Sequence, residues 1–103
     1  MKKIFYLISL AIILASCAKS SDNSAYTPDC SGTAKTFSKD ANPVISNSCS
    51  GCHSQYSTYS QIVASKASIR STIVDGTMPK GATLTAAQKN AVVCWIDNGT
   101  PNN

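Results

Sequence analysis

Hydrophobic residues in this chain form one unbroken run near the N-terminus, followed much later by segments with helical spacing. The run, IFYLISLAIILA, covers residues 4–15 and is interrupted only by Ser9. It is too short to cross a bilayer comfortably, and Lys2 and Lys3 precede it, which is typical of a secretory signal peptide. We therefore expect residues 1–16 to be removed as a signal peptide. An uncleaved anchor helix is the alternative.

Apolar residues between positions 37 and 75 have the spacing of helices. Ile62, Ile69 and Ile73 lie seven and four residues apart and so fall on one helix face. Pro43 stands where the first turn of a helix tolerates proline. The predicted helices are residues 37–47, 60–64 and 65–74, the last ended by Asp75 and Gly76.

The last helix is the best defined, because both of its ends carry signals. Thr85 and Gln88 have the spacing of a capping box, while Gly99 and Pro101 stop the helix. No stretch alternates with a period of two, so the sequence predicts an all-α domain at residues 37–103. A protein core of that size is marginal by itself and needs a covalent link or a prosthetic group.

Residues 17–36 separate the N-terminal run from this domain and have the composition of a flexible tether. Ser, Thr, Asp, Asn, Gly and Pro dominate the segment, and no hydrophobic period is visible. Cys30 interrupts the polar stretch.

The composition excludes several classes of protein. The 103 residues suffice for one small domain, and a charged fraction of 14% is too low for a disordered acidic or basic tail. Loss of Lys2 and Lys3 lowers the formal net charge from +4 to about +2, so we expect no nucleic-acid partner. The single histidine excludes a multi-histidine metal centre and argues against a Ser-His-Asp hydrolase.

The pentapeptide Cys49-Ser50-Gly51-Cys52-His53 carries the clearest chemical signal in the chain. C-x-x-C-H is the attachment signature of c-type haem. Two thiols three residues apart on a helical turn reach the two vinyl groups of one porphyrin, and the next histidine lies under the iron as proximal ligand. We therefore predict one covalently attached haem c, held by Cys49, Cys52 and His53.

Two other interpretations of the pentapeptide remain open. A thioredoxin-like dithiol requires a βαβ context, which the pattern lacks. A structural zinc site requires a fourth ligand beside Cys49, Cys52 and His53, and one more cysteine could supply it.

A haem iron in an electron-transfer protein usually has a sixth ligand, and Met78 is the one methionine outside the predicted signal peptide. A thioether opposite the imidazole raises the reduction potential. Pro79 favours an extended backbone at Met78, which suits a loop across the distal haem face. We predict Met78 as the distal ligand. Lys80 or water is the alternative ligand, and core packing is the alternative role of Met78.

The residues after the N-terminal run, Leu14-Ala15-Ser16-Cys17, resemble the lipobox of bacterial lipoproteins. The resemblance implies that Cys17 is acylated and becomes the mature N-terminus, so that lipid tethers the protein to a membrane. Ala18 stands where a retention Asp would favour the inner membrane. The resemblance therefore implies the cell envelope, at the outer membrane and facing the periplasm.

The segment from Phe37 to Gly99 resembles a small class I monohaem cytochrome c, most closely the cytochrome c-like lipoproteins of Bacteroidetes-type bacteria. The resemblance rests on Pro43 six residues before Cys49, the pentapeptide, Met78-Pro79, and a terminal Trp95-Ile96-x-x-Gly99. It implies a small cytochrome c-like helical fold around one haem, with His53 and Met78 as axial ligands.

Two cysteines remain after Cys17 is assigned to the lipid and Cys49 and Cys52 to the haem. Cys30 and Cys94 form an even pair in an oxidising compartment, and we predict a disulfide between them. This bond would join the end of the tether to the last helix and contribute about 4 kcal/mol in the chain-entropy model. Two free thiols are the alternative.

Aromatic residues near the motif and in the last helix suggest further contacts. Tyr56 and Tyr59 are expected to cover the proximal edge of the haem or to bind a propionate. Trp95 is expected to pack against the haem or against the first helix.

These features predict a membrane-tethered monohaem c-type cytochrome that carries single electrons between redox partner proteins. We expect an electron carrier rather than an enzyme, with no small-molecule substrate, because no acid–base constellation is visible. The alternatives are a haem-based sensor or a subunit of a larger redox enzyme with a labile sixth ligand, and a non-haem zinc-binding structural lipoprotein. A basic rim for an acidic partner could comprise Lys66, Arg70, Lys80 and Lys89.

Overall fold

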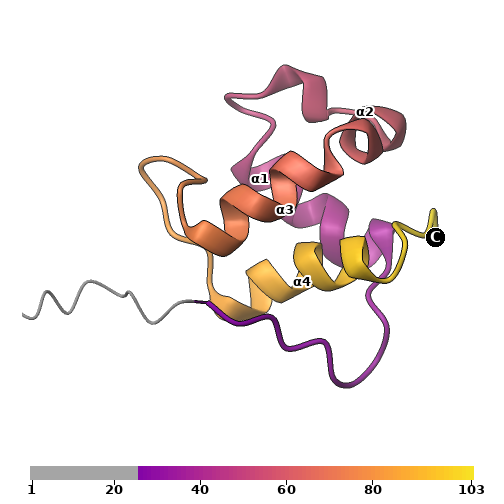
Figure 1. The fold of residues 1–103 in the computed structure, drawn as a ribbon. Coiled ribbons are helices and arrows are strands. Elements are labelled where there is room, and N and C mark those ends of the chain that lie inside the picture. The colour runs from indigo at the N-terminus through magenta and orange to yellow at the C-terminus, as the bar shows by residue number, and fades with distance from the viewer. Residues whose placement is uncertain (1–25) are drawn as a thin grey trace, which may run out of the picture.

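The computed structural model describes residues 26–103; the predicted signal peptide, Cys17 and the rest of residues 1–25 lie outside the described part. Within residues 26–103 all regular structure is helical and no strand is present, which confirms the all-α prediction for this part. The elements are the π-helical turn η1 (Phe37–Ala41), α1 (Asn42–Ser48), the 3₁₀ turn η2 (Ser54–Tyr56), α2 (Tyr59–Ala64), α3 (Lys66–Asp75) and α4 (Ala86–Asp97) (Figure 1).

Local hydrogen bonds determine where the helices begin and end, and the sequence predicts most of the capping residues. Thr85 Oγ1 accepts from the Gln88 backbone N–H at 3.1 Å, and Gln88 Oε1 accepts from the Thr85 N–H at 2.8 Å, so the predicted capping box of α4 is confirmed. Gly76 ends α3 in the left-handed region at φ 80°, which glycine adopts without steric cost. A second capping box, Thr58 with Gln61 at the start of α2, was not predicted.

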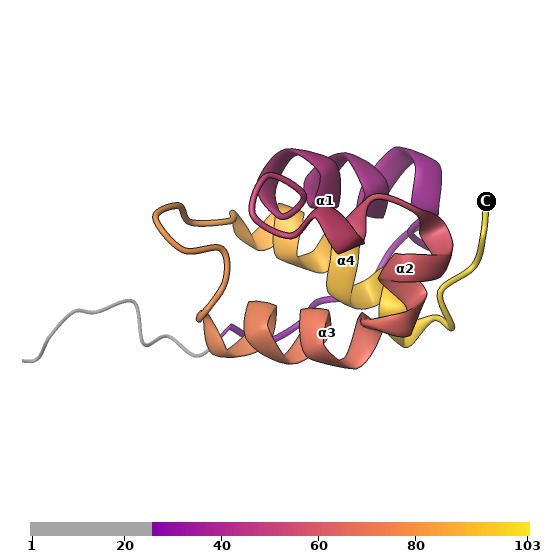
Figure 2. The same ribbon diagram turned by 90° about the horizontal axis from the view of Figure 1, so that it is seen from above.

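α4 occupies the middle of the domain. It packs against α3 on one side and against η1 and α1 on the other, as the view in Figure 2 shows. The side chains of Ile45, Val92, Val93 and Trp95 are fully buried. Helices of this length are marginal alone, so this burial of apolar side chains is what stabilises them.

Aromatic packing around Trp95 closes one side of the core. The Trp95 ring centroid lies 5.3 Å from that of Phe37 and 6.3 Å from that of Tyr59. Its indole N–H donates to the Pro101 carbonyl at 2.9 Å, and the Tyr59 hydroxyl donates to the Thr100 carbonyl at 2.6 Å. Trp95 therefore packs against the first helical segment, and Tyr59 holds the C-terminal residues.

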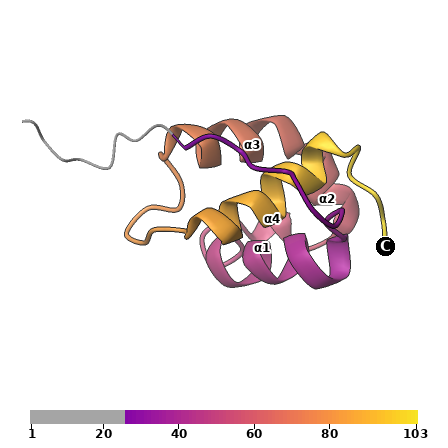
Figure 3. The same ribbon diagram turned by 90° about the horizontal axis from the view of Figure 1, so that it is seen from below.

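The second part of the predicted tether lies against α4, as Figure 3 shows. The predicted disulfide is present: Cys30 and Cys94 are bonded, with their Cα atoms 5.4 Å apart. Upstream, the Tyr26 hydroxyl and the Asp29 backbone N–H both donate to Asn90 Oδ1, the second at 3.2 Å. We call residues 26–30 the strap. The sequence predicted a flexible tether over all of residues 17–36, whereas the strap is attached to α4. The prediction missed these contacts because a polar composition does not reveal contacts with a distant helix.

Candidate functional site

The CSGCH pentapeptide forms a compact turn directly after α1. The backbone N–H groups of Cys52 and His53 both donate to the Cys49 carbonyl, at 3.2 and 2.9 Å. The Ser50 hydroxyl donates to the Tyr56 carbonyl at 3.0 Å, which joins the turn to η2. These hydrogen bonds fix the conformation of the turn that carries both cysteines and the histidine.

The turn forms one wall of a cavity of about 320 Å³. Met78, in the loop between α3 and α4, lines the same cavity, and its backbone N–H donates to the Thr72 carbonyl at 3.2 Å. The structure thus brings together all four residues predicted to hold the cofactor. The complete lining is Ser48, Cys49, Cys52, His53, Tyr56, Ser68, Ile69, Thr72, Ile73, Met78, Pro79 and Lys80.

α3 supplies the part of this lining that the sequence did not assign to the site. Ile69 and Ile73, one helical turn apart, are buried and present an apolar surface to the cavity. Ser68 and Thr72 add two hydroxyl groups. The isoleucine spacing predicted the buried face of α3, but periodicity alone cannot tell a core contact from a cavity wall.

The His53 imidazole is held by two neighbours. Its ring stacks on the Tyr56 ring, with centroids 5.0 Å apart and planes at 27°. Its Nδ1 lies 3.3 Å from the side-chain nitrogen of Gln55, an amide N–H donor, so Nδ1 accepts in this arrangement. Ligation of a metal by Nε2 requires the ring proton on Nδ1, with the Gln55 amide turned so that its oxygen accepts from it. Tyr56 therefore lies at the site, as predicted, whereas Tyr59 does not line the cavity.

The two thiols of the motif differ in their surroundings. Cys49 is partly buried and Cys52 is exposed, and both are free. Burial raises the pKa of the Cys49 thiol above its usual range, so this group is protonated at neutral pH.

The donor set and the apolar wall fit a haem. Two thiols, an imidazole and a thioether on two walls match covalent attachment and axial ligation. The zinc interpretation fits less well, since Cys30 and Cys94 are bonded to each other and neither is a free fourth ligand. Among residues 26–103, no group of three or more His, Cys, Asp or Glu side chains is arranged to hold a metal ion.

Two members of the predicted basic rim are engaged within the domain. The Arg70 guanidinium pairs with the Asp97 carboxylate at 2.6 Å, and the Lys89 ammonium lies 5.1 Å from the centre of the Tyr26 ring. Lys80 lines the cavity itself.

Comparison with known proteins identifies the N-terminal segment. Residues 1–18 match the model of the prokaryotic membrane lipoprotein lipid attachment site, and Cys17 lies inside the match. The protein is thus a lipid-anchored protein of the cell envelope, as the N-terminal pattern predicts. Comparisons of the chain with curated proteins and with solved structures gave no match. Within the described part, none of the helices is long and apolar enough to cross a membrane.

Proposed function

We propose that this protein is a lipid-anchored monohaem c-type cytochrome that carries single electrons between redox partner proteins. One observation carries the proposal: the thiols of Cys49 and Cys52, the His53 imidazole and the Met78 thioether all line one cavity with an apolar wall. The resemblance of residues 37–99 to class I cytochromes c is consistent with this arrangement.

Each of the four residues has a separate task in this proposal. When bound, haem supplies a one-electron Fe(III)/Fe(II) couple. The Cys49 and Cys52 thiols would hold it by thioether bonds, each formed by addition of S–H across a vinyl group, so no oxidant is required. His53, through Nε2, and Met78, through its sulfur, would hold the haem iron.

Other residues of this chain would orient the ligands and exclude water. Gln55 and Tyr56 fix the plane of the His53 ring through the amide contact and the ring stacking. The Met78 N–H bond to Thr72 ties the methionine loop to α3. Ile69 and Ile73 would lower the local dielectric, and a buried iron with a methionine ligand has a raised reduction potential.

A lipid anchor at Cys17 and a position at the outer membrane, facing the periplasm, belong to the same proposal. With both axial positions filled by side chains, the protein would act as a carrier rather than an enzyme, and its partners would be redox proteins. A labile Met78 would instead leave one axial position for an exogenous ligand, as in a sensor.

The test of the proposal is a pyridine haemochrome assay on protein exported by cells that contain a cytochrome maturation system. We expect one haem per chain, and intact-mass analysis should show one covalently added haem. Colourless protein with unmodified Cys49 and Cys52 would refute the proposal and favour the zinc interpretation.

The Met78 assignment has its own test with a matched control in the same loop. Met78→Ala should remove the sulfur-to-iron charge-transfer band at the red end of the visible spectrum and lower the midpoint potential. Lys80→Ala should leave the band in place. A Met78→Ala protein with an unchanged spectrum would rule out methionine ligation. Absence of the band from the unmodified protein, together with a changed spectrum in Lys80→Ala, would point to Lys80.

A further inference from the structure

The strap determines where the lipid-attached segment leaves the folded domain. Without it, the first residue held by the domain is Thr36, whose side chain accepts from the Lys39 N–H at the start of η1. With it, the disulfide holds Cys30, and the contacts of Tyr26 and Asp29 with Asn90 hold the chain back to residue 26. The ammonium group of Lys89 over the Tyr26 ring adds a cation–π contact.

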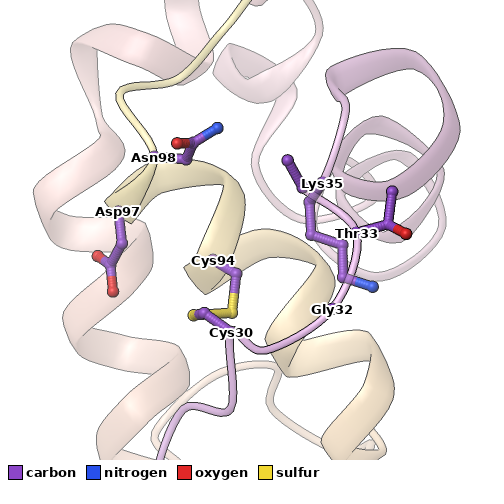
Figure 4. Close-up of a pocket in the computed structure, with 8 residues that line it drawn as sticks. Cys30, Gly32, Thr33, Lys35, Cys94, Asp97 and Asn98 are labelled. Carbon is purple, nitrogen blue, oxygen red and sulfur yellow. A yellow bond between two sulfur atoms is a disulfide. The ribbon is translucent and has the colours of Figure 1, made fainter.

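The strap is attached to α4 through residues 26–30 alone. The residues that follow it in the chain arch away from α4. A cavity of about 250 Å³ separates residues 32–35 from the end of α4 and lies beside the disulfide. Figure 4 shows Gly32, Thr33 and Lys35 on this arch, with Cys30 bonded to Cys94 at its base. The attachment of the strap therefore does not depend on the length of the arch.

Because the strap is attached to α4, the number of residues before it limits the distance between the lipid on Cys17 and the folded domain. Nine residue steps separate Cys17 from Tyr26, which span at most about 30 Å. Nineteen steps separate Cys17 from Thr36, which would span at most about 65 Å. The strap thus halves the greatest distance between a lipid on Cys17 and the domain.

The exit point also selects the end of the domain that is nearest to the membrane. In Figures 1, 2 and 3 the described chain begins at the end of the domain where α3 finishes and α4 starts. The α3–α4 loop at this end carries Met78, Pro79 and Lys80, which line the larger cavity.

We propose that the strap confines the domain to the membrane surface and that its partner is a membrane-bound redox protein with its redox centre near the lipid headgroups. The nature of the partner rests on the proposed electron-carrier function, whereas the restricted reach does not. A short tether keeps the α3–α4 end within about 30 Å of the lipid headgroups and excludes partners that stand further away than the tether extends.

Two insertions of the same ten Gly/Ser residues test the reach. One lies between Asp22 and Asn23, before the strap, and the other between Gly32 and Thr33, after the disulfide; both keep every cysteine. Neutron reflectometry of the full lipidated chain on a supported bilayer measures the separation of the protein layer from the headgroups. We expect the first insertion to move the layer outward by an amount on the order of 10 Å, and the second to leave it in place.

Removal of the disulfide should abolish the difference between the two insertions. In the Cys30→Ser/Cys94→Ser background, both insertions should move the layer outward equally. Equal outward shifts in the chain with its disulfide intact would overturn the proposal, whether or not the serine variant folds.

Electron exchange with a lipid-bound probe tests the partner class separately. A phospholipid with a ferrocene headgroup in the same bilayer transfers one electron to the oxidised protein and becomes ferrocenium. The first insertion should slow this reaction several-fold and leave reduction by soluble ferrocyanide unchanged, while the second should change neither. Failure of both reductants would contradict the carrier function alone; an unchanged lipid reaction after the first insertion would refute the membrane-bound partner.

Discussion

The two sides of α4 contrast in how completely they are packed. On the side of η1 and α1, Ala41, Ile45 and Trp95 are fully buried, and aromatic rings fill the space between the elements. On the side of α3, Ile69 and Ile73 are also buried, but they border a cavity of about 320 Å³. The α3 side is therefore less completely filled by side chains than the side of η1 and α1.

The contrast divides the domain by role. The η1–α1 side, which we call the packed side, is completed by side chains and by the C-terminal residues. The α3 side, which we call the cavity side, is completed in our proposal by the haem. A core of this size is marginal, and the Cys30–Cys94 bond supports it. The proposed haem would add a second covalent link, through Cys49 and Cys52.

The largest expected effect comes from the thiols of the cavity side. Cys49→Ser/Cys52→Ser should abolish covalent haem attachment, with loss of the visible absorption and of one haem mass by mass spectrometry. Hydrogen exchange should then be faster in α3 and in residues 76–85 than in α4, because the cavity side has lost the group that fills it.

The matched control is the other cysteine pair. Cys30→Ser/Cys94→Ser should keep one haem per chain, since neither residue lines the cavity. If the two double variants lose haem equally, the sides of α4 are not independent and the contrast fails.

The next effect separates packing from cofactor contact. Ile45→Ala removes a fully buried side chain from the packed side and should lower the free energy of unfolding by about 3 kcal/mol, with the visible spectrum unchanged. Ile69→Ala should also cost stability, but it should shift the midpoint potential, because this side chain lines the cavity. Urea unfolding and potentiometric titration measure the two quantities. A shift in potential from Ile45→Ala as large as that from Ile69→Ala would contradict the division.

The helices were predictable because their signals are local. Capping residues, the glycines at helix ends and the apolar spacing of Ile62, Ile69 and Ile73 act within a few residues of each other, and the predicted boundaries of α3 and α4 agree closely with the structure. The disulfide was predictable for a different reason, since only two cysteines were left without a role.

The remainder depends on contacts between distant residues. Nothing near Asn90 in the sequence shows that it accepts hydrogen bonds from Tyr26 and Asp29, more than sixty positions away, so the strap was missed. The pentapeptide predicts three of the ligands, but only the folded chain shows that α3 lines the same cavity. Haem binding itself stays a prediction.

A smaller effect compares the two capping boxes. Thr85→Ala removes the cap of α4, which contacts both sides, and should lower the global free energy of unfolding by about 1 kcal/mol. Thr58→Ala removes the equivalent cap of the six-residue helix α2 and should increase local hydrogen exchange there with less effect on global unfolding. Chemical denaturation and hydrogen exchange together distinguish these outcomes. An equal global loss would mean that α2 unfolds only with the whole domain.

The smallest expected effect concerns the ion pair that links α3 to α4. Arg70 Nε and Nη2 donate to the two Asp97 carboxylate oxygens at 2.6 and 3.0 Å, and this hydrogen bonding holds the pKa of Asp97 below its usual range. A lowered folded-state pKa contributes stability above the unfolded-state pKa of about 4, and this stability is lost as the pH falls through the lower folded value. Both side chains are more than a third exposed, at 38% and 39%, so solvent screening limits the contribution to less than about 1 kcal/mol. Asp97→Asn should therefore be slightly less stable than the unmodified protein at pH 7, and the two should converge as the pH falls below the folded-state pKa of Asp97, or in 1 M salt. A difference that persists in 1 M salt would show that Asp97 acts through packing rather than charge, and that α3 is joined to α4 by more than this pair.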